Sequence, residues 1–235
     1  MIQEELTGRK GKGVDGLAKT REVKLGCVFT QTTTDVRGLP VRDPDATSFV
    51  GAIESAEDFG WRIYGEALRR GLSKAQRVVV LADGAQWIKN LAQMHFPEAK
   101  LIIDLYHARQ HVSELCKTLF AGNDKKIRQQ RMRWWTDLDG GKVEKIIGQA
   151  QQHLPHQDAE AKKKAEIEIH YLEKNAESMR YAEFRAQGLF VGSGVVEAGC
   201  KTLIGQRLKQ SGMEWSARGA NAIISLRCIL TSGRF

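Results

Sequence analysis

The stretch RVVVLADGA at residues 77–85, together with KLIIDLYH at residues 100–107, decides the expected fold. Each is a short apolar run that ends at a carboxylate, Asp83 in the first and Asp104 in the second. Such runs are typical of strands buried in a parallel sheet. A helix of about ten residues, closed by the Phe-Pro pair at residues 96–97, fits between them. The pattern therefore predicts a β-α-β unit with a right-handed crossover.

Polar side chains follow both predicted strands at their carboxyl ends, where sheets of this kind keep their chemistry. Asp83 precedes Gly84, which lets a ligand approach, and this is a common way to hold a divalent cation. The alternative is that each aspartate caps the helix after it. His107, His111 and Cys116 follow the second aspartate at helical spacing and raise the alternative of a zinc site, without a fourth ligand at tight spacing.

Other elements follow from periodicity. Alternating apolar residues predict a strand within residues 21–32, and apolar residues at intervals of three to four predict a helix opened by Ser48 and ended by Gly71. Residues 108–187 have a helical and polar pattern, which GSG at residues 192–194 breaks. Two further helices are expected, over residues 195–209 and 216–230.

Composition indicates a basic globular protein. The 235 residues include 36 Lys plus Arg and 28 Asp plus Glu, a formal charge of +8. With 42% hydrophobic residues, the chain is not a disordered polyelectrolyte, a collagen-like repeat or a coiled-coil rod. No apolar run of 18 residues and no secretory signal occur, so we expect a cytoplasmic protein without a membrane span. Four cysteines without paired spacing are expected to be reduced.

Basic residues gather in two regions. The first, at residues 125–133, runs into Trp134 and Trp135, and the second, at residues 201–234, holds six basic residues against the single acid Glu214. Basic helices interleaved with aromatic residues suit phosphate contact and base stacking. A solvated helix face is the alternative. Nucleic acid is therefore an expected partner.

Several strings, taken in order from about residue 7 to 231, resemble the ISKra family of bacterial insertion-sequence transposases. They are REVKLGCVFTQT, VVLADGAQWIKNLA, FPEAKLIIDLYHARQH, YLEKNAESMRYAEFRAQGLFVGSGVVEAGCK and RLKQSGMEWSARGANAIISLR. The resemblance implies an RNase H-like core with a DDE acidic triad, interrupted by a helical insertion before the Glu, as in Mutator-like transposases. In this sequence Asp83 looks like the second acid and Glu197 like the third, while Asp104 with His107 looks like a D-x-x-H motif.

The implied chemistry explains why such carboxylates are needed. They hold two Mg²⁺ (or Mn²⁺) ions about 3.5 to 4 Å apart, which activate the attacking oxygen and stabilise the leaving one. We expect Asp83 and Glu197 as metal ligands and catalytic residues, with Asp104 and His107 in support. The reaction would cleave transposon ends and transfer the 3′-hydroxyl into target DNA, in a homo-oligomer associated with the nucleoid. The expected DNA contacts are Lys201, Arg207, Lys209, Trp215, Arg128, Arg131 and Arg133.

The sequence departs from that family at the first acid. Related transposases carry a DGTGVP-like strand before the stretch that resembles TGRKGKG, and Asp35 in the turn TTTDVRG is a poor substitute for its aspartate. In the RNase H-like order that strand is central, between the strand at 21–32 and the strand at 77–82. We therefore expect an α/β chain with an RNase H-like core that lacks its central strand, as the distal fragment of a transposase. The alternative is a catalytically inactive remnant that only binds DNA.

These inferences divide the chain into four segments. We expect a flexible basic loop at 1–20, the first part of the core at 21–107, the helical insertion at 108–190, and C-terminal helices at 191–235 that complete the core with Glu197.

Overall fold

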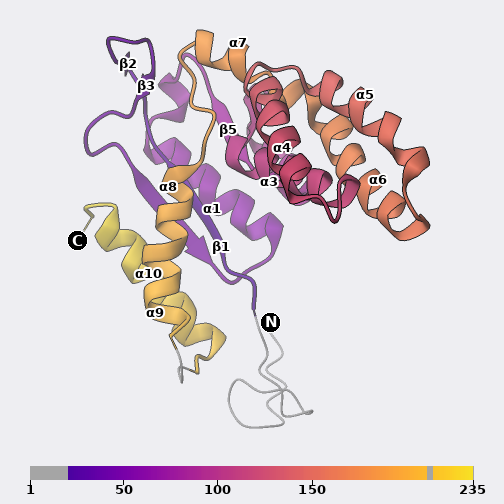
Figure 1. The fold of residues 1–235 in the computed structure, drawn as a ribbon. Helices are drawn as coiled ribbons and strands as arrows, with labels where there is room; N and C mark the ends of the chain where they lie inside the picture. Colours follow the sequence, from indigo (N-terminus) through magenta and orange to yellow (C-terminus); the bar gives the residue numbers. More distant parts are fainter. Residues whose placement is uncertain (1–20, 211–213, 235) are drawn as a thin grey trace. The chain divides into compact units, whose positions relative to one another are not determined.

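The computed structural model describes residues 21–210 and 214–234, and they fall into two compact units (Figure 1). The first unit comprises residues up to 33, residues 42–76 and residues from 194 onward, and the second comprises residues 34–41 and 77–193. The loop expected over residues 1–20 lies outside the described residues.

The second unit contains the predicted β-α-β element. Strands β5 (Val79–Ala82) and β6 (Lys100–Ile103) pair in parallel, with Val79 opposite Lys100, and α2 (Gln86–His95) connects them. The α2 helix ends before Pro97, as the sequence predicted. Ile102 and Ile103 have no exposed surface, whereas β5 is only partly buried apart from its last residue. Parallel pairing brings the carboxyl ends of both strands to one edge.

Helices follow β6 without another strand. They are α3 (Leu105–Leu119), α4 (Asp124–Asp139), α5 (Val143–His153), α6 (Ala159–Asn175) and α7 (Tyr181–Ala186). The helical pattern predicted for residues 108–187 is thus confirmed. A 3₁₀ turn (Ala176–Met179) separates α6 from α7. Trp134 anchors this core: its ring is completely buried and its Nε1 donates to Gln149, at 2.7 Å.

The first unit is built on an antiparallel pair, β1 (Lys24–Val28) and β4 (Ser48–Ala52), with Cys27 opposite Phe49. Helices α1 (Ala56–Arg69) and α10 (Ala217–Thr231) pack against β4. Just before α10, the first unit also contains α8 (Gly194–Gly199), a π-helical segment (Cys200–Gly205) and α9 (Gln206–Leu208). The strand predicted within 21–32 is confirmed.

One predicted helix begins too early. The spacing from Phe49 onward fits a helix, but residues 48–52 form β4, because they pair with β1, whose residues lie at least twenty positions earlier in the chain. The α1 helix begins at Ala56, where the hydroxyl of Ser55 accepts from the backbone N–H of Asp58, at 3.0 Å. Local periodicity carried no sign of that long-range pairing.

A small pair of strands, β2 (Thr33–Thr34) and β3 (Pro40–Val41), was also not predicted. Asp35 shapes the turn between them, since its Oδ1 accepts from the backbone N–H of Arg37 at 2.8 Å and of Leu39 at 2.9 Å. These hydrogen bonds, the one from Leu39 foremost, lower the pKa of the Asp35 carboxyl. The role of this aspartate is therefore in the turn.

The chain is of mixed α/β class, and each sheet in its described part has two strands. Within residues 21–210 and 214–234, no helix is both long and apolar enough to cross a membrane. All four cysteines are free thiols, as predicted.

We predict that Gly199→Ala destabilises the first unit. A Cβ at this position would lie 2.6 Å from Cε1 of the buried Phe49 ring, and overpacking of this kind costs about 1–3 kcal/mol, offset by about 1 kcal/mol of helix propensity. Urea unfolding should show a loss of about 0–2 kcal/mol against the unmodified chain, and of about 1–3 kcal/mol against a glycine-to-alanine change without the clash. Gly205→Ala is the matched control, because its Cβ would make only an ordinary 3.5 Å contact, with the Cys200 carbonyl oxygen. Equal stability of the two variants would contradict the packing.

Candidate functional site at the carboxyl ends of β5 and β6

Asp83 is an exposed carboxylate that follows β5 directly. Its Oδ1 accepts from the backbone N–H of Ala85, at 2.8 Å, which closes a tight turn. The α2 helix begins only at Gln86, with Ala85 at the N-cap, so this carboxylate does not cap the helix. Oδ2 has no hydrogen-bond donor among the described residues. One carboxylate oxygen is thus open to a ligand.

Tyr171 on α6 holds the loop that carries Asp83. The Tyr171 hydroxyl donates to the carbonyl oxygen of Asp83, at 2.8 Å. Gly84, the next residue after Asp83, has φ 90°, and a Cβ at this position would lie 3.0 Å from the Tyr171 ring. Burial, and then the charges of Asp83, Asp104 and Glu168, raise the pKa of Tyr171, so its hydroxyl stays protonated and able to donate. Glycine is therefore required by both backbone conformation and space.

Asp104 has a different environment from Asp83, because its side chain is buried with 3% exposed. It caps α3: Oδ1 accepts from the backbone N–H of His107, at 2.8 Å, and Oδ2 accepts from that of Ser193. Both oxygens are thus occupied by backbone donors, which fits the capping alternative raised from the sequence. This carboxylate positions the start of α3 and the segment before α8.

His107 and His111 lie on one face of α3, one turn apart. Their Nε2 atoms are 3.2 Å apart, and Nδ1 of His111 is 2.6 Å from Oε2 of Glu168 on α6. The ring of Tyr171 stacks on that of His111, with centroids 3.5 Å apart. Sequence reasoning missed Glu168 and Tyr171, and their only signal is the three-residue spacing that places both on one face of α6.

Cys116 does not join this group. It is completely buried in the core of the second unit, and burial raises its pKa to about 12. Within the described residues, no three His, Cys, Asp or Glu side chains gather in a way that could hold a metal ion.

Glu197, the predicted third acid, has an exposed side chain on α8. It belongs to the first unit, whereas Asp83, Asp104 and His107 belong to the second. Its assignment therefore still rests on the resemblance.

The basic residues near the C-terminus fall into two groups. Lys201, Arg207, Lys209 and Arg218 are exposed, and the Arg207 guanidinium lies 5.3 Å from the centre of the Trp215 ring. Arg227 instead donates to the backbone carbonyls of Thr202 and Leu203, and Arg234 pairs with the buried Glu66, at 3.1 Å. The first group is available to a ligand, whereas Arg227 and Arg234 are engaged within the first unit.

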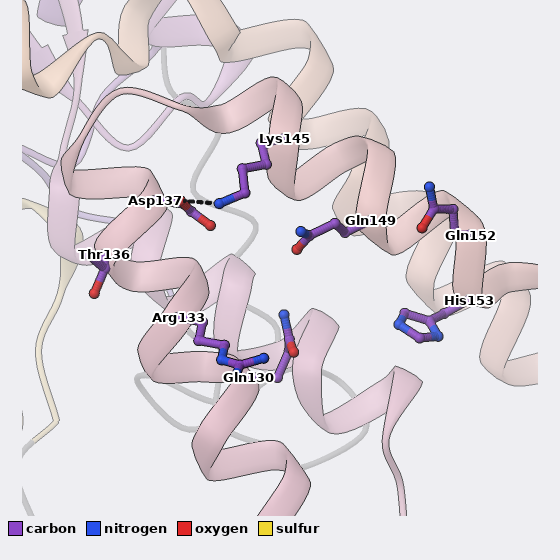
Figure 2. Close-up of a pocket in the computed structure, with 8 residues that line it drawn as sticks. All are labelled: Gln130, Arg133, Thr136, Asp137, Lys145, Gln149, Gln152 and His153. Atoms are coloured by element: carbon purple, nitrogen blue, oxygen red, sulfur yellow. Dashed lines mark hydrogen bonds and ion pairs between the residues drawn. The ribbon is translucent and has the colours of Figure 1, made fainter.

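The other basic region lies on α4. Arg128 and Arg133 are exposed, while the Arg131 guanidinium lies 5.2 Å from the centre of the Trp135 ring. Trp134 is in the core, so it has no face for stacking on a base. A groove of about 620 Å³ lies between α4 and α5. Asp137 and Lys145, which both line it, form an ion pair at 2.8 Å (Figure 2). The lining of the groove is polar: Gln130, Arg133, Thr136, Asp137, Lys145, Gln149, Gln152 and His153.

Comparison with known proteins gives one match. A family model described as an uncharacterised protein family (UPF0236) matches residues 47–234. No curated protein and no solved structure matches the chain.

We predict that Tyr171→Phe loosens the loop at residues 83–85. The variant keeps the ring but removes the hydrogen bond to the carbonyl oxygen of Asp83, which should lower the free energy of unfolding by about 0.5–1.5 kcal/mol. Hydrogen exchange at the Gly84 and Ala85 amides should become faster. Tyr106→Phe is the control, since this tyrosine is exposed on α3. Unchanged exchange in Tyr171→Phe would show that the loop is held by other contacts.

Proposed function

The chain belongs to the uncharacterised protein family UPF0236, and we propose that its activity is cleavage and strand transfer of DNA by a two-metal mechanism, as in the insertion-sequence transposases that it resembles. The observation that carries the proposal is the open carboxylate oxygen of Asp83. Asp83 is an exposed carboxylate at the carboxyl end of a parallel strand, beside a glycine, and one of its oxygens has no donor among the described residues. This is the position that the resemblance gives to the second acid.

Strand pairing agrees with the proposal that the chain contains part of an RNase H-like core. The resemblance places a central strand between the strands that are β1 and β5 here. Within the described residues β1 pairs only with β4, antiparallel, and β5 pairs only with β6, parallel. Within the described residues, β1 therefore has one side without a ladder partner, and so does β5. β4 and β6 each have an open side as well, so the pairing agrees with such a core and the resemblance carries this part of the proposal.

The side chains at this edge differ in how well they fit Mg²⁺ or Mn²⁺. Both ions prefer oxygen ligands, and Asp83 offers an exposed one. Asp104 does not fit as a direct ligand, because both of its oxygens accept from backbone N–H groups, and we assign it a supporting role. Glu197 lies outside this edge, in the first unit, and is the third carboxylate by resemblance alone. A bound ion would polarise the attacking water or 3′-hydroxyl.

DNA is the substrate that the surface charge favours. Lys201, Arg207 and Lys209 are exposed along one short stretch of the first unit, and such side chains neutralise phosphates. Trp215, which is partly exposed beside Arg207, adds an aromatic face on which a base can stack. In the second unit Arg128, Arg131 and Arg133 extend the proposal to α4.

We predict that nicking of supercoiled plasmid DNA requires Mg²⁺ or Mn²⁺ and Asp83, the second of the three acids, and that Asp83→Asn lowers its rate by about 100-fold or more. Asparagine keeps the oxygen that accepts from Ala85 but loses the charge that a cation needs. Glu197→Gln should have a similar effect. The readout is conversion of supercoiled to open-circular plasmid on a gel.

Asp45→Asn is the matched control, because Asp45 is exposed in the first unit and asparagine tolerates its φ of 51°. Cleavage that persists in Asp83→Asn would contradict the proposal. Absence of cleavage in the unmodified chain, with DNA binding retained, would favour a second candidate: a protein that binds DNA without cutting it. The observation in favour of this candidate is the exposed basic stretch with Lys201, Arg207 and Lys209, which can neutralise phosphates without a metal ion.

We predict that Arg207→Ala weakens binding to a 30-base-pair duplex and reduces the slope of log K against log salt by about 1, because one phosphate contact is lost. Fluorescence anisotropy at several salt concentrations measures this slope. Lys162→Ala removes an exposed charge from α6 and should leave the slope unchanged. Equal slopes in both variants would show that Arg207 does not contact DNA.

A further inference from the structure

We propose that His107 and His111 form a binding site for a divalent transition-metal ion such as Zn²⁺, coordinated by their two Nε2 atoms. The site lies within the second unit and uses neither Asp83 nor Glu197. It shares His107 with the D-x-x-H motif of the resemblance but none of the carboxylates proposed as metal ligands for DNA cleavage.

The spacing of the two rings suits one metal ion. His107 and His111 are four residues apart on α3, which places them on the same face. Their Nε2 atoms are 3.2 Å apart. Since Zn–N bonds are about 2.0–2.1 Å long, two nitrogens on a tetrahedral zinc ion lie about 3.3 Å apart. The two atoms already have the separation that a shared ion requires.

Glu168 supplies the second feature of a histidine metal site. Its Oε2 is 2.6 Å from Nδ1 of His111, so Nδ1 donates to the carboxylate, and in the neutral ring the lone pair is on Nε2. A carboxylate on the far nitrogen of a metal-binding histidine fixes the ring and raises its basicity. Stacking of Tyr171 on the same ring, at 3.5 Å, restricts its rotation. His111 is thus oriented before any ion binds.

The rest of the coordination shell is open. Asp104 has both oxygens on backbone donors, and Cys116 is in the core, so neither is a further ligand. The side chain of His111 is 25% exposed and that of His107 is partly exposed, which gives an ion access from solvent. Water molecules would complete the coordination shell. Imidazole nitrogen selects Zn²⁺, Ni²⁺ or Cu²⁺ over Mg²⁺, so this site differs in chemistry from the oxygen at Asp83.

Without an ion, the same 3.2 Å separation is a hydrogen bond from Nε2–H of His107 to Nε2 of His111. Metal binding replaces this hydrogen, with His107 protonated on Nδ1 instead. A metal titration distinguishes the two roles, because a histidine pair that serves only as a structural hydrogen bond would not bind zinc.

Isothermal titration of the full chain with Zn²⁺, in the presence of a reductant that does not bind zinc, tests the site. We expect one ion per chain, with affinity at least about 10-fold lower in His107→Gln and in His111→Gln. Glu168→Gln should weaken binding by about 10- to 100-fold, since it removes only the orienting carboxylate. His170→Gln is the matched control, an exposed histidine on the same helix as Glu168, and should bind as the unmodified chain does.

Circular dichroism of each variant separates loss of the site from loss of the fold. If a histidine variant unfolds, NMR of the unmodified chain decides, because zinc must shift the imidazole Nε2 resonances of His107 and His111. Zinc affinity unchanged in both histidine variants, or no binding to the unmodified chain, would overturn the proposal. Asp83→Asn should retain zinc binding, so a failure of the proposed DNA cleavage leaves this result intact.

Discussion

The hydrogen bond from the Tyr171 hydroxyl to the carbonyl oxygen of Asp83 ties α6 to the loop after β5, and the candidate site depends on it. The same ring occupies the space beside Gly84 and stacks on His111. One side chain therefore sets the course of the acidic loop and the orientation of an imidazole. Its position is fixed in turn by α6, which packs on α3 in the core of the second unit.

Two aspartates at equivalent ends of parallel strands have different roles, because their burial differs. Asp104 is enclosed and uses both oxygens to bind backbone N–H groups, which stabilises the start of α3. Asp83 is exposed and uses one oxygen to close its own turn. The edge thus offers an oxygen ligand for a hard cation, while the imidazoles of His107 and His111 offer nitrogen for a softer one. Metal choice separates the two proposals experimentally.

Sequence reasoning predicted what depends on local pattern and missed what depends on distant partners. The β5–α2–β6 unit follows from two apolar runs with a helix between them, and both aspartates were placed correctly at the strand ends. Residues 48–52 were expected to be helical, because the pairing with β1 leaves no local signal. Glu168 was missed for the same reason: its partner His111 lies 57 residues earlier, and no motif links them.

The central claim is that the exposed carboxylate of Asp83 is a ligand for a hard divalent cation at the carboxyl edge of β5. Titration of the ¹⁵N-labelled chain with paramagnetic Mn²⁺ tests it most directly, because resonances near the bound ion broaden first. The account predicts that amides of residues 83–85 broaden at the lowest Mn²⁺ concentrations and that Asp83→Asn abolishes this effect. Broadening that begins elsewhere, or that persists at residues 83–85 in Asp83→Asn, would contradict it.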